Sequence, residues 1–185
     1  MQSDYPLTRR ALIKAGFALL ACNALPSFAR AYAARESRAL NFHNIHTGES
    51  LKTVYWEQGV YLTEALKDIS YVLRDHYTND MKPIDPRLLD VIATLHAALD
   101  SSKPFEVVSG YRSPRTNAML CRASRGVNPQ SLHMFGKAID IRLRDERLRR
   151  IRDEAMAMRQ GGVGYYPGSD FVHLDTGPVK YWQFK

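Results

Sequence analysis

Two histidines and one aspartate are the residues whose types and order point most directly to chemistry. His133 lies seven positions before Asp140, and His173 follows much later in the chain. Two imidazoles and one carboxylate are typical of catalytic zinc, because three protein ligands leave a fourth position for water. We therefore expect these three side chains to form a metal site. The alternative is that both histidines are only hydrogen-bonded within a core.

The segment that carries Asp140 has the pattern of a β-strand. Across residues 137–143 small or polar residues alternate with apolar ones, which predicts a strand with one buried face. Asp140 and Ala138 share the other face, so we expect Asp140 to point away from the core, beside space for an ion. Gly136 lets the backbone turn without a Cβ that would clash between the ligands.

A second short strand is expected at residues 171–175, and it carries the last histidine. The same alternation puts His173 and Asp175 on one face. Asp175 could orient the imidazole from behind the metal, or it could act as the general base. It could also belong only to a turn at the end of the strand, with Thr176 and Gly177.

The elements that must position these residues predict a single α+β domain. Helical and strand patterns do not alternate strictly, which favours a mainly antiparallel central sheet with flanking helices. Asp85 followed by Pro86 predicts the start of one helix, and we expect Asp145 to cap another. The expected strands are residues 38–46, 51–56, 105–109, 137–143, 163–166 and 171–175, and the expected helices are residues 63–77, 85–99, 115–122 and 145–159.

Residues 1–33 have the features of an export signal. Two adjacent arginines precede an apolar stretch at residues 15–25, which is too short to span a bilayer and resembles a twin-arginine signal. A Sec signal and a buried amphipathic helix are the alternatives. We expect cleavage near Ala33, with a site after Ala29 as the other option, so that residues 34–185 form the domain.

Charge and the export signal together limit the partners and the location. The chain of 185 residues has a net charge of +7, and removing residues 1–33, with four basic residues and one acidic residue, lowers it to +4. Acidic residues interleave with or follow the basic run 142–152, which is typical of a solvated helix rather than a nucleic-acid surface. We expect a periplasmic monomer that binds no nucleic acid. A membrane would be a partner only if Cys22, which lies in a lipoprotein-like box, were acylated.

Four segments, in matching order, resemble one family. Residues 131–140 have the pattern Ser-x-His-x-x-Gly-x-Ala-x-Asp, residues 109–113 read Ser-Gly-Tyr-Arg-Ser, and residues 171–178 read Phe-Val-His-Leu-Asp-Thr-Gly-Pro. With residues 161–167, they resemble zinc peptidases of the D-alanyl-D-alanine carboxypeptidase group, and more narrowly the exported murein endopeptidases of the YcbK/MepK type. The resemblance extends from about Leu40 to Trp182 and implies a Hedgehog/DD-peptidase-like fold.

This resemblance implies hydrolysis of peptide bonds in the stem peptides of peptidoglycan. Zinc would be held by His133, Asp140 and His173, and it would activate a water molecule for attack on the carbonyl carbon. The guanidinium of Arg112 would clamp a substrate carboxylate in bidentate geometry, although a surface ion pair is the alternative for this residue. Ser131 would at most donate a hydrogen bond to the substrate.

The resemblance also implies a general base. In relatives, an acidic residue three positions before the last metal histidine takes this role, and that position is Asp170 here. On an ideal strand Asp170 would face away from His173, so its role requires a bend at residues 168–169. The sequence therefore leaves two candidates for the base, Asp170 and Asp175.

Three functional hypotheses follow from the sequence. The first is an endopeptidase that cuts cross-links between stem peptides. The second is a carboxypeptidase that removes terminal D-alanine at the same metal site, with Arg112 binding the free carboxylate. The third is a non-catalytic wall-binding module that keeps the metal for structure.

Aromatic residues and histidines elsewhere in the chain give weaker indications of function. Tyr165, Tyr166 and Trp182 could line a peptide or glycan groove, or they could belong to the core, as aromatic residues near strands usually do. The histidines that have no partner at ligand spacing, and that we expect to be structural or solvated, are His43, His46, His76 and His96.

Overall fold

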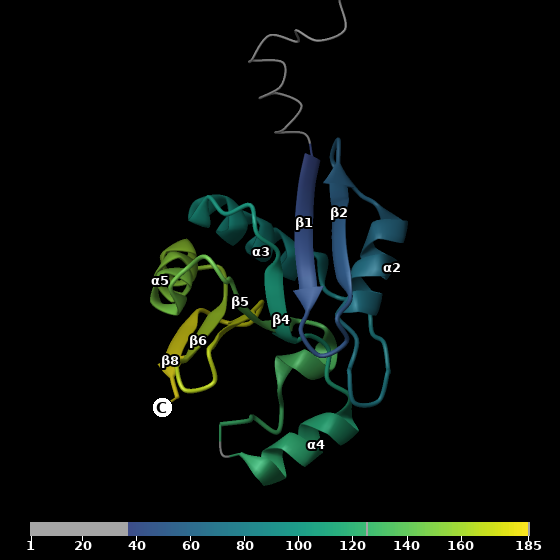
Figure 1. Ribbon diagram of the computed structural model, residues 1–185. Helices are drawn as coiled ribbons and strands as arrows, with labels where there is room; N and C mark the ends of the chain where they lie inside the picture. The colour runs from purple at the N-terminus through teal and green to yellow at the C-terminus, as the bar shows by residue number, and fades with distance from the viewer. Residues whose placement is uncertain (1–36, 125, 185) are drawn as a thin grey trace, which may run out of the picture. The chain divides into compact units, whose positions relative to one another are not determined.

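A computed structural model describes residues 37–124 and 126–184 of the protein (Figure 1). The expected export signal, its cleavage site and Cys22 lie outside the described residues. Within the described part of the chain, no helix is long and apolar enough to cross a membrane.

One sheet of eight strands organises the domain, in the order β3-β2-β1-β4-β5-β7-β6-β8. The strands are β1 (Ser37–Asn44), β2 (Ser50–Glu57), β3 (Val60–Tyr61), β4 (Phe105–Ser109), β5 (Ala138–Arg142), β6 (Gly162–Tyr166), β7 (Phe171–Asp175) and β8 (Lys180–Gln183). Neighbouring strands are antiparallel except for β1 with β4 and β6 with β8. The expected α+β class with a mainly antiparallel sheet is confirmed. The sequence had not predicted the two edge strands, β3 and β8, which are short and mostly exposed.

Within residues 37–124 and 126–184, four α-helices and one 3₁₀-helix accompany the sheet. They are α2 (Thr63–Val72), α3 (Pro86–Leu99), α4 (Pro114–Ala123), α5 (Leu148–Met158) and the 3₁₀-helix η1 (Leu132–Phe135). The predicted start of α3 is confirmed, because the Asp85 side chain accepts a hydrogen bond from the backbone N–H of Arg87 and Pro86 occupies the first turn.

Helix α2 is shorter than the sequence predicted, because it ends at Val72 instead of Tyr77. Beyond its end, the carboxylate of Asp75 accepts hydrogen bonds from the backbone N–H groups of Tyr77 (2.9 Å) and Ser113 (2.7 Å). A side chain that bonds nearby backbone amides competes with the helical hydrogen bonds. The same contact ties the end of α2 to the loop that carries Arg112.

The predicted cap of α5 is wrong. This helix begins at Leu148, after Arg147, and no side chain caps it. Asp145 instead accepts a hydrogen bond from the hydroxyl of Ser101, at 3.0 Å. The carboxylate thus links two loops instead of ending a helix.

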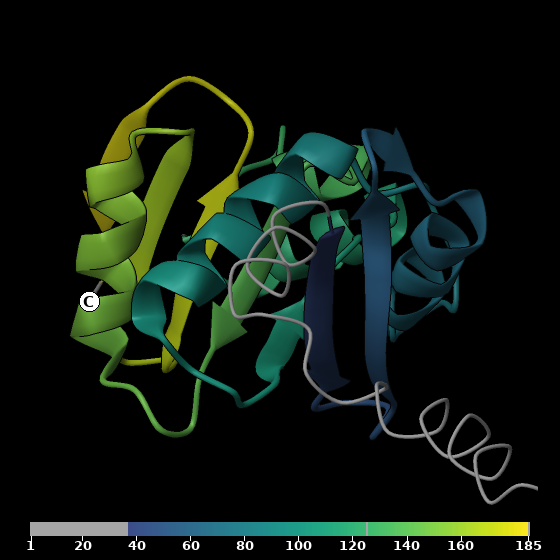
Figure 2. The same cartoon turned by 90° about the horizontal axis from the view of Figure 1, so that it is seen from above.

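An apolar core joins the sheet to helices α2, α3 and α5. Helices α2, α3 and α5 contribute buried side chains to the same cluster as β5 and β7, whose core residues include Ile139, Ile141, Val172 and Leu174. Figure 2 shows α3 and α5 next to each other, and contacts join α3 to β1 and α5 to β6 and β7. Burying each large aliphatic side chain contributes about 1.5–3 kcal/mol. This face of the sheet is therefore the stable support.

Strand β5 differs from the expected half-buried strand because its other face is buried too. Asp140 points away from the apolar core, as predicted, but only 2% of its surface is exposed. It lies between Ser109 on β4 and His173 on β7 in the register of the sheet, and η1 contacts β5. The alternation identified the correct face, but it could not show that other segments cover this face.

Candidate metal centre

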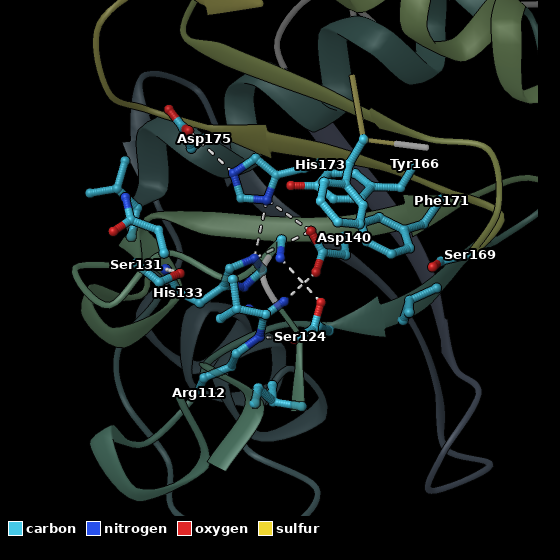
Figure 3. Close-up of a pocket in the computed structure, with 18 of the residues that line it drawn as sticks. Arg112, Ser124, Ser131, His133, Asp140, Tyr166, Ser169, Phe171, His173 and Asp175 are labelled. Carbon is cyan, nitrogen blue, oxygen red and sulfur yellow. Dashed lines mark hydrogen bonds and ion pairs between the residues drawn. The ribbon is translucent and has the colours of Figure 1, made fainter. Parts of the chain in front are cut away.

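The side chains of His133, Asp140 and His173 converge at the middle of the sheet (Figure 3). Their candidate ligand atoms all lie within 4.8 Å of one another. His173 Nδ1 is 2.8 Å from Asp140 Oδ1 and 3.2 Å from His133 Nε2. Asp140 and His173 are cross-strand partners on β5 and β7, so the sheet register itself places them side by side.

His133 reaches this cluster from η1, the short helix just before β5. Ser131 accepts a hydrogen bond from the backbone N–H of His133 at the start of η1, and Gly136 ends the helix in a left-handed conformation, with φ of 64°. The Nδ1 atom of His133 lies 2.6 Å from the carbonyl oxygen of Gly110. Because a carbonyl can only accept, Nδ1 carries the proton and Nε2 presents its lone pair to the cluster.

Asp175 lies behind His173 and orients the second imidazole. Its Oδ2 is 3.2 Å from His173 Nε2, and its Oδ1 accepts hydrogen bonds from the backbone N–H groups of Gly162 (3.0 Å) and Gly177 (2.7 Å). The carboxylate accepts from Nε2–H, so Nδ1 of the neutral ring can act as a ligand. Carboxylates in this position fix the tautomer of metal-binding histidines.

The protonation states of the three clustered side chains favour the binding of a cation. Burial, followed by the nearby Arg112 guanidinium, lowers the pKa of His133 to about 4, so this ring is neutral at pH 7. Burial opposes ionisation of Asp140, but the neighbouring His133 and Arg112 outweigh it and hold the pKa of its carboxyl well below the usual value. Burial also opposes the charge on His173, but the hydrogen bonds with Asp140 and Asp175 raise its pKa to about 8.

The donor set therefore fits zinc. It offers two imidazole nitrogens and one carboxylate oxygen close enough together for one ion to reach all three, which is the combination found in catalytic zinc sites. The acidic surroundings favour a positive charge at this point even without an ion, as the raised pKa of His173 indicates. The geometry brings together all three residues that the sequence predicted as ligands.

Arg112 is part of the cavity wall and is largely buried. Its guanidinium contacts Asp140 Oδ2 through a terminal nitrogen, and its Nε–H donates to the hydroxyl of Ser109 at 2.8 Å. Its backbone N–H donates to the carbonyl of His133. The surface ion pair considered from the sequence is therefore wrong. The guanidinium holds one oxygen of Asp140 and leaves the other facing the histidines.

A cavity of about 720 Å³ surrounds the cluster and extends on both sides of it. Toward β1 it is lined by His46 and His76, whose rings stack at 3.9 Å. Toward β8 it is lined by Tyr166, Trp182 and other aromatic residues. Because β5 and β7 lie between β1 and β8 in the sheet, the metal cluster is flanked by cavity on either side.

The structure shows where the remaining aromatic and imidazole residues lie. His46 and His76, which were expected to be structural or solvated, line the cavity. They lie 30 positions apart in the sequence, so no local spacing could reveal their stacking. Tyr165, by contrast, packs against the core and under the guanidinium of Arg152, and it does not line the cavity as Tyr166 and Trp182 do.

Ser131 lies in the wall of the cavity, whereas Asp170 does not. Ser131 is buried and lines the cavity, beside His133. Asp170 is not among the residues that line the cavity; 65% of its side chain is exposed, and its carboxylate pairs with Arg142 at 3.0 Å. The turn before β7 does bend, with φ of 54° at Asp170, but this bend leaves the carboxylate outside the cavity.

Sequence reasoning did not find Asp75, which supports the loop of Arg112. Its carboxylate is 1% exposed and accepts the backbone N–H of Ser113. Burial opposes its charge, but the hydrogen bonds from Thr116 and Ser113 outweigh it and lower its pKa. The only signal was an acidic residue within a predicted helix, which normally faces solvent.

Comparisons with known proteins point to one family. The model of the family Peptidase_M15_2, described as peptidoglycan L,D-endopeptidase MepK, matches residues 32–182. The peptidoglycan L,D-endopeptidase MepK of Escherichia coli K12 is 41% identical over 179 residues, which cover 96% of this chain and 98% of that protein. A probable peptidoglycan L,D-endopeptidase MepK of Haemophilus influenzae is 42% identical over 147 residues, or 79% of each chain.

Proposed function

The chain belongs to the Peptidase_M15_2 family, and from this membership we propose that it is a zinc-dependent endopeptidase that hydrolyses peptide cross-links in peptidoglycan. The observation that carries the proposal is the cluster of His133, Asp140 and His173 at the centre of an open cavity. A purely structural zinc site would be closed by a fourth protein ligand. Among the described residues, only these three side chains form such a group.

The three clustered residues would hold the zinc ion. When bound, zinc would lower the pKa of a coordinated water toward about 7 and polarise the substrate carbonyl. The chain's own contribution is orientation: the Gly110 carbonyl directs His133, and Asp175 directs His173. Arg112 keeps one oxygen of Asp140 occupied, so the other stays directed at the histidines.

Substrate contacts are proposed for Arg112 and Ser131. The guanidinium of Arg112 lies in the cavity wall and has five N–H donors, of which Asp140 and Ser109 use two. Its remaining donors can bind a carboxylate or a peptide carbonyl of the substrate. Ser131 lines the same cavity and can add one hydrogen bond.

We assign the role of proton acceptor to Asp175 in preference to Asp170. Apart from Asp140, Asp175 is the only carboxylate among the described residues that lines the cavity. Its hydrogen bond with His173 Nε2 orients that ring, and its place in the cavity wall lets the carboxylate take up a proton from a group in the cavity. Asp170 faces solvent and Arg142.

Cavity on both sides of the cluster supports an endopeptidase over a carboxypeptidase. A cross-link has peptide on both sides of the scissile bond, whereas a terminal alanine requires little space beyond the metal. The two relatives are named L,D-endopeptidases, so we propose that the bond cleaved here joins an L- and a D-configured residue.

Digestion of purified sacculi tests this proposal. Release of monomeric stem peptides from cross-linked dimers, identified by mass, is the expected result. Loss of single alanine residues from monomers would identify a carboxypeptidase. Absence of any product, with zinc bound, would identify the wall-binding module.

Export to the periplasm is proposed from residues 1–33, and lipid attachment is the alternative. The expected outcome of cell fractionation is a soluble periplasmic protein that starts near Ala34. A membrane fraction that becomes soluble after Cys22→Ser would show that the chain is acylated instead.

A further inference from the structure

Tyr166 is a polar residue of the cavity to which the proposed function assigns no role. It is the last residue of β6, and its side chain lies beside His173 and Asp140 (Figure 3). Its ring stacks on Phe171 with 4.5 Å between centroids and 17° between planes, and Phe184 lies against it at 6.0 Å. Packing on both neighbours restricts the ring to one orientation.

Within the described part of the chain, the hydroxyl of Tyr166 accepts one hydrogen bond and donates none. The indole Nε1–H of Trp182 donates to the Tyr166 oxygen at 2.9 Å. An indole can only donate, so the tyrosine proton is not used in this bond. Among the described residues, no hydrogen bond has the Tyr166 hydroxyl as its donor. The proton is therefore available to a group that enters the cavity.

Trp182 is itself fixed by the strands around it. It pairs with Gly164 in the register of β6 and β8, and Gly164 also pairs with His173. A Cβ at Gly164 would lie 2.7 Å from Nε1 of the indole, so the absence of a side chain there makes the space that the indole occupies. The Trp182 ring lies 5.3 Å from the His173 ring. The tyrosine oxygen is thus held close to the metal cluster.

The electrostatic setting keeps the phenol neutral. Burial is the main cause that raises the pKa of Tyr166, and the Asp140 carboxylate adds to it. A neutral phenol keeps its proton and can donate a hydrogen bond. Hydrogen-bond donors fixed in advance near a reacting carbonyl stabilise the negative charge that develops on its oxygen.

We propose that Tyr166 is a catalytic residue whose hydroxyl donates a hydrogen bond to the oxygen of the scissile carbonyl as negative charge develops there, and that Trp182 is its positioning residue. This inference rests on the proposed peptidase function. It requires no transfer of the tyrosine proton, since the phenol keeps its O–H bond throughout.

The variant Tyr166→Phe tests the proposal because it removes only the hydroxyl and keeps the stacked ring. We expect kcat on cross-linked muropeptide to fall about 100-fold, as for the loss of one oxyanion donor, with KM, zinc content and melting temperature little changed. Tyr165→Phe is the matched control, because it makes the same change on the adjacent residue, outside the cavity. It should retain wild-type activity.

Two further measurements separate catalysis from structure. A phosphinate analogue of the scissile peptide should bind on the order of tenfold more weakly to Tyr166→Phe, measured by calorimetry, while the cleaved product binds equally well. Trp182→Phe should lower kcat less than Tyr166→Phe, and the double variant should lose no more than Tyr166→Phe alone, because the indole acts through the hydroxyl.

Wild-type kcat and phosphinate affinity in Tyr166→Phe would overturn the inference. A failure of the proposed function would look different, since the wild-type protein itself would then release no peptide from cross-linked muropeptide.

Discussion

The clustered side chains owe their orientation to partners that lie behind them. The imidazole of His133 is directed by a backbone carbonyl, and that of His173 by Asp175. The carboxylate of Asp140 is directed by Arg112. Such outer partners change metal affinity by about 10–100-fold when they are removed. Substitution of these partners should therefore change zinc affinity even when the three ligands are intact.

Asp175→Asn should weaken zinc binding by about 10–100-fold. The asparagine oxygen can still accept from the amides of Gly162 and Gly177, which leaves its NH₂ group facing His173 Nε2. That ring nitrogen must then accept, so the proton moves to Nδ1, the atom that faces the cluster. Zinc affinity, measured by competition with a chelating dye, checks this expectation.

Asp170→Asn is the matched control for this change. Its side chain is exposed and paired with Arg142, so the variant should keep wild-type zinc affinity and nearly all of its hydrolysis. If Asp170→Asn abolished hydrolysis while Asp175→Asn did not, the assignment of the proton acceptor would be reversed.

The helices and strands near the site could be predicted where a pattern in neighbouring residues marks them. Alternation located β5 and β7, and Asp85 with Pro86 located α3. The cover of β5 could not be predicted, because η1 folds back onto the strand that directly follows it and the loop of Arg112 reaches Asp140 from 28 positions away. Helix α2 ended early for the same kind of reason, since the partner of Asp75 is a backbone amide 38 positions away.

Gly136 should be sensitive to substitution because it ends η1, the element that carries His133. Its φ is 64°, and a Cβ there would lie 2.3 Å from the carbonyl oxygen of Pro83. We expect Gly136→Ala to reduce the free energy of unfolding by about 1–3 kcal/mol and to weaken zinc binding. Urea denaturation and zinc titration measure the two effects.

Gly59→Ala separates backbone strain from the clash. Gly59 has φ of 85° but no atom within 4 Å of an added Cβ, so this variant should lose only about 1 kcal/mol and keep its zinc affinity. Equal effects of the two substitutions would mean that the contact with Pro83 is unimportant.

Glu106 on β4 joins the sheet to two arginines and should control stability in acid. It is 3% exposed, and it accepts hydrogen bonds from Arg142, at 2.8 Å, and from Arg144. Burial alone would raise the pKa of Glu106, but these hydrogen bonds outweigh it and lower the pKa. A lowered folded-state pKa gives stability that is present above the unfolded-state pKa of about 4.3 and is lost as the pH falls through the folded-state value.

Glu106→Gln should therefore be less stable than wild type at pH 7, by about 1–3 kcal/mol, and should lose less stability between pH 5 and pH 3, a window of roughly one unit on either side of the carboxyl pKa. Thermal unfolding across this range measures the difference. The same acid dependence in both proteins would show that Glu106 is not the titrating group.

In the whole molecule, the sheet carries the proposed active site at its middle, with cavity on both sides of it. The motifs of the sequence predicted the three clustered residues, but not the width of the cavity, whose lining includes both His46 near β1 and Trp182 on β8. Residues so far apart in the sequence line one cavity because of the order of the strands.

Because the cavity extends on both sides of the cluster, the rate of cleavage should not depend on the C-terminal group of the substrate. A cross-linked peptide with an amidated C-terminus should be cleaved at a rate similar to that of the free acid, measured by chromatography of the products. Strict dependence on the free carboxylate would favour the carboxypeptidase, with Arg112 as its anchor.

The most direct test of the central claim is to measure zinc content and sacculus digestion together in the wild-type protein and in His133→Ala. His43→Ala is the control, because His43 lies on β1 and bonds Ser50 outside the cavity. We expect stoichiometric zinc and release of cross-linked peptides in wild type and in His43→Ala, with both lost in His133→Ala although it remains folded by circular dichroism. Undiminished hydrolysis by His133→Ala, or wild-type protein that binds zinc but cleaves no peptidoglycan, would contradict the proposed zinc peptidase.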